Sequence, residues 1–154
     1  MASGIRDLKV WQEAVLLGGE VVRAMRQGSR REIKAFTDHV MHTAVGVAAA
    51  IAEGYGHYSN VEQRPHFAQA KRCLATLETE LAIARQAGLM TPAVHAALGV
   101  RIAVVSRLLT GYLGFLDRQL TVEQDASHIA RSAPVASLLV HTASHGALGD
   151  RAPQ

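Results

Sequence analysis

The residues that could do chemistry in this 154-residue sequence surround one glycine-rich stretch. In the segment AAAIAEGYGHYSN (48–60), Gly54 and Gly56 precede Ser59, a spacing superficially similar to loops that bind nucleotide phosphates. Such loops follow a strand and open a helix whose free backbone N–H groups face the phosphate. Here a helical pattern precedes the glycines, and the Lys-Ser/Thr pair of a P-loop is absent. The stretch therefore predicts a corner between two helices, in which Gly54 or Gly56 supplies the left-handed residue that ends the first one.

The other reactive side chains give little support for an enzyme. Glu53 falls in the last turn of a helical pattern, where the helix dipole disfavours a carboxylate, so we expect a neighbouring helix to supply a basic side chain or N–H partner. His39 and His42 have a spacing that can ligate a metal, but the facing segments offer no partners for them. Cys73, the single cysteine, is expected to be an inert packed thiol. The sequence predicts no catalytic residues, no metal site and no cofactor.

A cluster of cations is the clearest candidate for binding. Its members are Arg23, Arg26, Arg30, Arg31 and Lys34. Only Glu32 offsets this charge, and such a cluster can follow the phosphates of a nucleic acid. The alternative is a solvated helix end, because cations also suit a helix C-terminus. The net charge of the whole chain, +3 with neutral histidines, is modest for a nucleic-acid binder.

Four segments with apolar residues three or four positions apart must position these groups. Their spacing predicts helices at about 7–27, 31–54, 60–88 and 92–119. In the first segment the predicted core stripe is Leu8, Trp11, Val15, Gly18, Val22 and Met25. Ser59 with Glu62 forms a capping box, and Thr91-Pro92 is a typical helix start. No segment alternates as a half-buried strand does. We predict an all-α, antiparallel up-and-down four-helix bundle over residues 1–120.

The remaining chain, residues 121–154, has a different character. Ser, Ala, Gly and Pro interrupt the apolar pattern, with one short apolar run at 135–140. We expect a mobile tail with at most one short helix at that run. Its histidines, His128, His141 and His145, are scattered and are interpreted as incidental, although His141 and His145 would share a face if their segment were helical.

Apolar residues outside the main stripes predict self-association. They include Leu16, Leu17, Val21, Val100, Val104, Leu108, Leu113 and Phe115. A helix that is apolar on more than one face is usually buried on more than one side, and a bundle of this size has one interior. The N-terminus does not read as a secretory signal, and the longest nearly uncharged stretch, 40–52, is too short to span a bilayer. We therefore expect a cytoplasmic protein without membrane association.

Four pieces of sequence, in order, support a family resemblance. They are DLKVWQEA (7–14), AAAIAEGYG (48–56), Ser59 with Glu62, and LETELAIARQAGL (77–89). Together they resemble the four-helix-bundle proteins first noticed as reading frames inside intervening sequences of bacterial 23S rRNA. The resemblance covers about residues 5–120. It implies a homopentameric ring and a relationship to the accessory variability proteins of diversity-generating retroelements, which bind nucleic acid and a reverse transcriptase. No catalytic residues come with it.

The sequence departs from that family on its second helix. Where the family has Gln, a spacer and two arginines, this chain has His39, Met41 and His42, and an expected Arg is His57. Each lost arginine would weaken phosphate binding, whereas histidines protonated at mildly acidic pH would restore positive charge. The predicted function is a non-enzymatic oligomeric accessory or scaffold protein. It would contact the backbone of structured RNA, or of DNA, through the arginine cluster, Lys34, His42 and His57. The alternative is a protein–protein interaction module that binds no nucleic acid.

Overall fold

The computed structural model of the chain describes residues 4–28 and 31–132. They form α1 (Lys9–Gly28), α2 (Lys34–Tyr55), α3 (Asn60–Gln86) and α4 (Pro92–Ser132). Two short 3-10 turns, η1 (Ile5–Asp7) and η2 (Arg31–Ile33), precede α1 and α2. No strand occurs in the described ranges, so the predicted all-α class with four helices is confirmed. Residues up to 121 form one compact unit, and residues 122–132 belong to a second.

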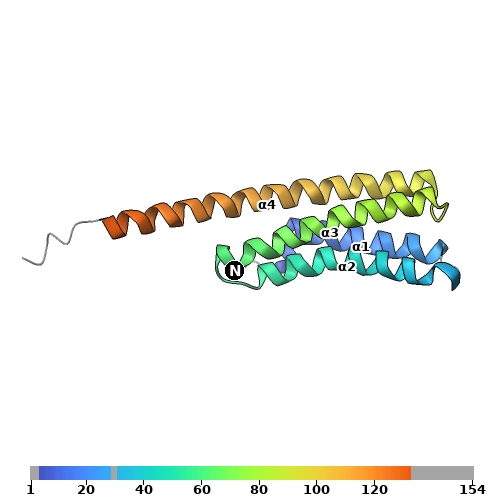
Figure 1. The fold of residues 1–154 in the computed structure, drawn as a ribbon, viewed down its shortest axis with the longest axis horizontal. Coiled ribbons are helices and arrows are strands. Elements are labelled where there is room, and N and C mark those ends of the chain that lie inside the picture. Colours follow the sequence, from blue (N-terminus) through green and yellow to red (C-terminus); the bar gives the residue numbers. More distant parts are fainter. Residues whose placement is uncertain (1–3, 29–30, 133–154) are drawn as a thin grey trace, which may run out of the picture. The chain divides into compact units, whose positions relative to one another are not determined.

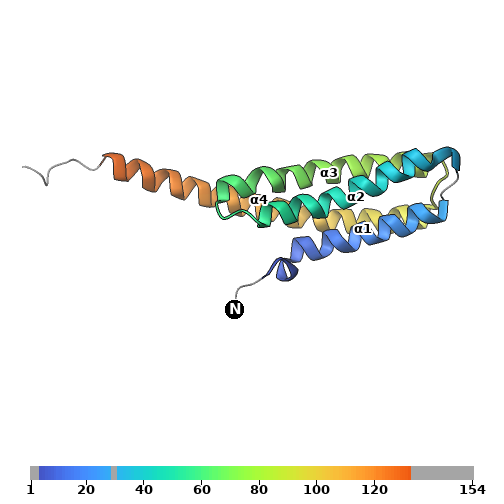
Figure 2. The same cartoon turned by 90° about the horizontal axis from the view of Figure 1, so that it is seen from below.

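Within the first unit the four helices lie alongside one another around a shared core (Figures 1 and 2). α2 is the central element of their backbone packing, because it lies close to both α1 and α3. Residues 56–59 connect α2 to α3, and residues 87–91 connect α3 to α4. These connections are short, as in helical bundles whose sequential helices are neighbours.

The predicted helix starts are confirmed by their caps. The Oγ of Ser59 accepts a hydrogen bond from the backbone N–H of Glu62 (3.3 Å) and donates one to its Oε2 (2.8 Å). The Oγ1 of Thr91 accepts a hydrogen bond from the backbone N–H of Val94 at 3.2 Å, directly before α4 begins at Pro92. Each cap satisfies a backbone donor that the first turn of the helix leaves free.

The glycines of the α2–α3 corner differ from the prediction. Gly56 has a φ of −70°, and α2 stays right-handed through Gly54 and Tyr55. Gly88, after α3, is the only glycine in the described ranges with a positive φ (73°). The prediction of a left-handed Gly54 or Gly56 was therefore wrong. A Cβ on the buried Gly54 would lie 2.8 Å from Cε2 of Phe67, so this glycine lets α3 pack directly against the α2 backbone.

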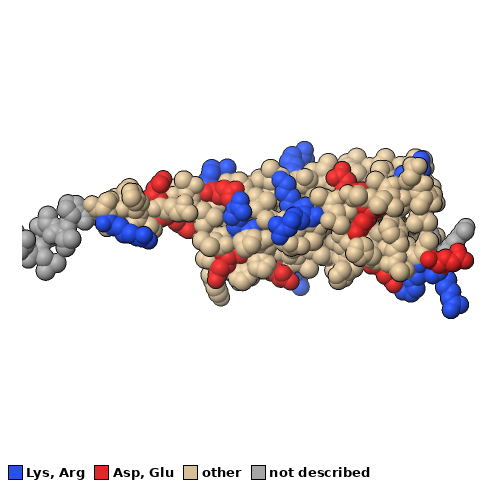
Figure 3. All heavy atoms as spheres, viewed as in Figure 1, with Lys and Arg blue, Asp and Glu red and all other residues tan. Residues whose placement is uncertain are grey.

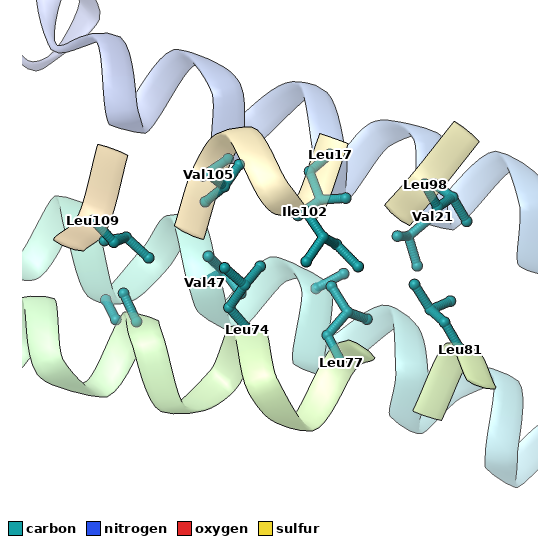
Figure 4. Close-up of a cluster of buried hydrophobic side chains, with 14 of the residues drawn as sticks. Leu17, Val21, Val47, Leu74, Leu77, Leu81, Leu98, Ile102, Val105 and Leu109 are labelled. Carbon is teal, nitrogen blue, oxygen red and sulfur yellow. The ribbon is translucent and has the colours of Figure 1, made fainter. Parts of the chain in front are cut away.

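The core draws side chains from all four helices (Figure 4). Its labelled members are Leu17, Val21, Val47, Leu74, Leu77, Leu81, Leu98, Ile102, Val105 and Leu109, all buried. Apolar residues three or four positions apart predict core stripes through Leu74, Leu77 and Leu81 in the third segment and through Leu98, Ile102, Val105 and Leu109 in the fourth, and these stripes supply most of the labelled residues. On α1 the prediction is confirmed in part: Met25 is buried, and Leu8 and Trp11 pack against the core. It was wrong for Val15, which is 44% exposed, and for Leu17 and Val21, which were expected outside the core stripe and are fully buried. This helix carries two adjacent apolar stripes, and the same spacing fits both.

Small residues bring α2 close to its neighbours. A Cβ on Gly18 of α1 would lie 3.8 Å from the carbonyl oxygen of Ala44. One on Gly46 would lie 3.8 Å from Sγ of Cys73 on α3. α4, by contrast, contributes leucine, isoleucine and valine side chains to the core. Close backbone packing therefore holds α1, α2 and α3 together, whereas α4 packs against the core through its leucine, isoleucine and valine side chains.

α4 continues beyond the predicted end near residue 119. It reaches Ser132, with no Gly or Pro between 115 and 132 to stop it. The hydroxyls of Thr121, Ser127 and Ser132 donate hydrogen bonds to the carbonyl oxygens four residues earlier. Every residue from 121 to 132 is exposed, so the apolar pattern fails there while the helix does not. The predicted tail segment 133–154, with its short helix at 135–140, lies outside the described residues.

One helix in the described ranges, α4, is long and apolar enough to cross a membrane by length and composition alone. A single helix of this kind is weak support for a membrane span, because core helices of soluble proteins meet the same criterion.

We expect the substitution Gly54→Ala to lower the free energy of unfolding by about 1–3 kcal/mol, because the new methyl group would overlap Phe67 and the Cβ of His66. Urea unfolding followed by circular dichroism measures the change. Gly46→Ala is the matched control on the same helix, since its Cβ would meet Cys73 at an ordinary distance. Equal stability of the two variants would contradict the close packing of α3 on Gly54.

Candidate functional site

Three seams of the bundle carry the polar contacts between helices, and each has a different chemistry. The α2–α3 seam contains His39 and Glu80, and the α1–α4 seam contains Arg101. The α3–α4 seam contains Arg64 and Lys71. The fourth boundary, between α1 and α2, is an open groove lined by uncharged residues. Polar candidate sites therefore lie on three boundaries, and the fourth offers an apolar surface.

The predicted arginine cluster gathers at the end of the bundle where α1 gives way to α2. Arg23 and Arg26 are exposed on the last turns of α1, Arg31 is exposed in η2, and Lys34 opens α2. Lys and Arg atoms are visible at that end of the molecule (Figure 3). With Gln27, the two α1 arginines line a shallow hollow of about 340 Å³. Arg30 lies outside the described residues.

The charges of this cluster are largely uncompensated. Lys34 pairs with Asp38 one turn further along α2. The other ion pairs in the described part of the chain involve none of Arg23, Arg26 or Arg31. These guanidinium groups are accessible to an anion, and an arginine presents its donors in a planar fork that suits a phosphate.

The two predicted histidines do not join the arginine cluster. His42 is exposed on α2, about 12 Å along the helix from Lys34 at the usual rise per residue. His57 follows the opposite end of α2, a helix of 22 residues and roughly 33 Å. Its ring stacks on that of His66, with the ring centroids 4.7 Å apart. The predicted set therefore divides into a terminal cluster, a flanking histidine and a distant one.

The α2–α3 seam holds a buried carboxylate. Oε1 of Glu80 lies 3.0 Å from Nε2 of His39 and accepts a hydrogen bond from Oγ1 of Thr43 at 3.1 Å. Oε2 of Glu80 is buried and has no hydrogen-bond partner in the described part of the chain. His39 is therefore engaged in holding α2 to α3. A buried carboxylate oxygen without a partner carries a desolvation penalty. The contacts of Oε1 with His39 and Thr43 hold this buried carboxylate between α2 and α3.

The same seam confirms the prediction for Glu53. Its Oε2 lies 3.4 Å from Nδ1 of His66, a basic side chain on the neighbouring helix α3. In residues 4–28 and 31–132, no three His, Cys, Asp or Glu side chains come together in a way that would hold a metal ion.

The α3–α4 side carries cations that the sequence analysis missed. Lys71 donates a hydrogen bond to Oγ1 of Thr110 on α4 (3.1 Å), and Arg64 pairs with Asp117. Arg72, Arg107 and Arg118 are exposed on the same two helices. Lys and Arg atoms gather over α3 and α4 in Figure 3. Residues 61–121 hold seven Lys and Arg against four Asp and Glu, so counting charge by helix would have found this surface.

Ion pairs within α1 and between helices lower the pKa values of two carboxyl groups. On α1, the hydrogen bond from Lys9 lowers the pKa of Glu13, and Arg101 lowers it further against the effect of burial. Arg101 also binds Glu20 at 2.7 Å, which ties α4 to two turns of α1. On α4, the hydrogen bond from Arg64 lowers the pKa of Asp117. Both carboxylates therefore contribute to stability in their charged forms.

Comparison with known proteins adds a family match. The model of the family described as 23S rRNA-intervening sequence protein matches residues 6–111, from η1 to the middle of α4. A comparison with curated proteins found no match.

We expect the protein to lose stability in acid as the pH falls through the lowered pKa values of Glu13 and Asp117. Because these pKa values are lower in the folded state, the unfolded state binds more protons, and stability rises with pH up to about 4–5. Urea unfolding at a series of pH values measures this slope. Arg64→Gln should flatten it, because Asp117 then loses its partner.

Arg72→Gln is the control, since the Arg72 guanidinium donates its hydrogen bond to Gln69 on the same helix and does not join α3 to α4. If Arg64→Gln and Arg72→Gln showed the same acid slope as the wild type, the Arg64–Asp117 pair would have no role in acid stability.

Proposed function

The chain belongs to the family of 23S rRNA-intervening sequence proteins, and on this premise we propose that it is a non-enzymatic accessory or scaffold protein that associates with structured RNA. The observation that carries the proposal is the presence of two exposed cationic surfaces on one family member. The first is the terminal cluster of Arg23, Arg26, Arg31 and Lys34. The second, the α3–α4 cluster, is Lys71, Arg72, Arg107 and Arg118.

Both surfaces suit the phosphate backbone of a nucleic acid. In the part of the chain that the structure describes, no arginine of either cluster has a carboxylate partner, and Lys34 pairs with Asp38. Cations that approach phosphates release counterions from the nucleic acid, which supplies affinity independent of base sequence. Such contacts fix the position of a protein on the strand and do not read bases. This supports recognition of RNA shape and charge.

The proposed assembly is a homopentameric ring of antiparallel up-and-down bundles in the cytoplasm, without membrane association. The short connections at 56–59 and 87–91 support the antiparallel order. Exposed apolar side chains support self-association: Val15, Leu16, Val45 and Val100 are 44–69% exposed. The five-fold number comes from the family resemblance.

A protein–protein interaction module that binds no nucleic acid is the second candidate. The open groove between α1 and α2 favours it, because none of the side chains that line it is charged. A partner protein could cover such a surface, whereas RNA would find no cation there.

Titration of tag-free protein into a labelled structured RNA at several salt concentrations tests the proposal. We expect log affinity to fall linearly with log salt. Arg26→Gln with Arg31→Gln should reduce that slope by about one for each phosphate contact removed, and so should Lys71→Gln with Arg107→Gln. The two pairs show which cluster carries the contacts.

Arg26→Lys with Arg31→Lys is the matched control, because it keeps the charge of the terminal cluster and should keep the slope. Absence of binding at low salt would overturn the nucleic-acid proposal and favour the protein-binding alternative. If binding were tight and none of these substitutions weakened it, neither cluster would make the phosphate contacts.

A further inference from the structure

An apolar groove lies between α1 and α2. It has a volume of about 490 Å³ and lies open to solvent. Trp11, Gly18 and Gly19 on α1 line it, as do Val45 and Ala48 on α2. It exists because small residues bring the two helices close, so no long side chain covers their backbones. A surface of this kind accepts a ridge of side chains from another helix.

The chemistry of the groove restricts its occupant. All of its lining residues are apolar or glycine, so a phosphate, an acidic peptide or a basic peptide finds no charge to pair with. The rim residue Val45 is 55% exposed in the single chain. Contiguous apolar surface of this kind marks a site that another molecule covers. An uncharged, apolar helix face therefore suits the groove.

The chain itself exposes such a helix on α4. Ala96, Val100 and Ala103 are exposed and lie four and three residues apart, on one stripe of the helix. We name this stripe the α4 ridge. Val100, at its centre, is 69% exposed. Between residues 86 and 107 the only Asp, Glu, Lys or Arg is Arg101, whose guanidinium is held by Glu13 and Glu20. The ridge is therefore as neutral as the groove.

A lipid bilayer suits the α4 ridge less well. Arg107 lies four residues beyond Ala103 on the same stripe, and it is exposed. A guanidinium at that position would be expensive to place in hydrocarbon. A protein surface that covers the ridge only as far as Ala103 leaves the Arg107 guanidinium in water.

We propose that the α1–α2 groove of one copy receives the α4 ridge of a second copy. The inference rests on the proposed function, in which the chain self-associates, and it names the two surfaces that meet. Groove and ridge are different surfaces: one lies between α1 and α2, and the other is on the solvent side of α4, away from its contacts with α1 and α3. The interface is therefore heterologous, and an open chain of copies has one free groove at one end and one free ridge at the other until the ring closes.

A complementation experiment tests this pairing. Val45→Glu places a charge on the groove, and Val100→Glu places one on the ridge, both at exposed positions. We expect each variant alone to be monomeric by light scattering. An equimolar mixture should form complexes of two chains and no larger, because only the ridge of the first variant and the groove of the second remain intact. Formation of the pair also shows that both variants are folded.

Val61→Glu is the matched control. Val61 is 64% exposed on α3, outside both surfaces, so this variant should keep the wild-type mass. The pairing would be overturned if Val45→Glu or Val100→Glu kept the wild-type mass, or if their mixture stayed monomeric. Those outcomes leave self-association itself intact. A monomeric wild type would instead refute the oligomeric part of the proposed function.

Cysteine cross-linking gives a second readout. In a Cys73→Ser background, Ala48→Cys marks the groove and Val100→Cys marks the ridge. On oxidation, neither protein should cross-link with itself, and the mixture should give a disulfide-linked dimer. Efficient cross-linking of Val100→Cys alone would indicate ridge-to-ridge contact and overturn the heterologous pairing.

Discussion

The close approach of α2 to both of its neighbours is the constraint on which the rest of this structure depends. At Gly54 the approach leaves no room for a Cβ beneath Phe67, and at Gly18 and Gly46 it leaves only ordinary contact distance. Helices that pack backbone to backbone need no long side chains between them, so the α1–α2 boundary stays an open groove. On the other side of α2, the same proximity buries the carboxylate of Glu80 against His39 and Thr43.

α4 follows a different principle, and this difference separates the surfaces of the bundle. Leucine, isoleucine and valine side chains fill the space under α4, and Arg101 ties it to Glu13 and Glu20 on α1. Ion pairs of this exposure contribute modestly, so the apolar contacts carry most of the attachment. The outer stripe of α4 keeps small apolar residues, and the cations of α3 and α4 lie further along these helices. Apolar and charged surfaces are therefore segregated.

The sequence predicted the parts of the fold that local rules control. The stripes of the third and fourth segments, the cap at Ser59, the pairing of Glu53 and the family were all confirmed. It failed for Val15, Leu17 and Val21 on α1, where two stripes have the same period and only tertiary packing decides which residues are buried. It also assigned Gly54 a conformational role, although glycine is needed there because Phe67 of α3 leaves no room for a Cβ. A clash between helices leaves no local signal in the sequence.

The candidate site was harder to predict than the fold, because it depends on distances across the bundle. The terminal cluster was visible as a run of arginines, whereas Lys71 is placed against α4 only by the packing of the two helices, through its contact with Thr110, one turn beyond Arg107. His57 was grouped with the arginines by family position, but α2 separates it from them by its whole length. Charge patterns within one helix are readable from sequence, and charge patterns between helices require the fold.

The modest charge of one chain links the proposed assembly to the proposed binding. A net charge of +3 gives a single copy few phosphate contacts, and the counterion-release contribution scales with their number. In a ring, every copy presents the same two clusters, and linked sites bind one RNA with much higher effective concentration than separate sites. Association through the proposed groove and ridge would use surfaces that carry no charge of their own. Self-association through apolar surfaces would thus be the means by which weakly basic chains form a strongly cationic particle.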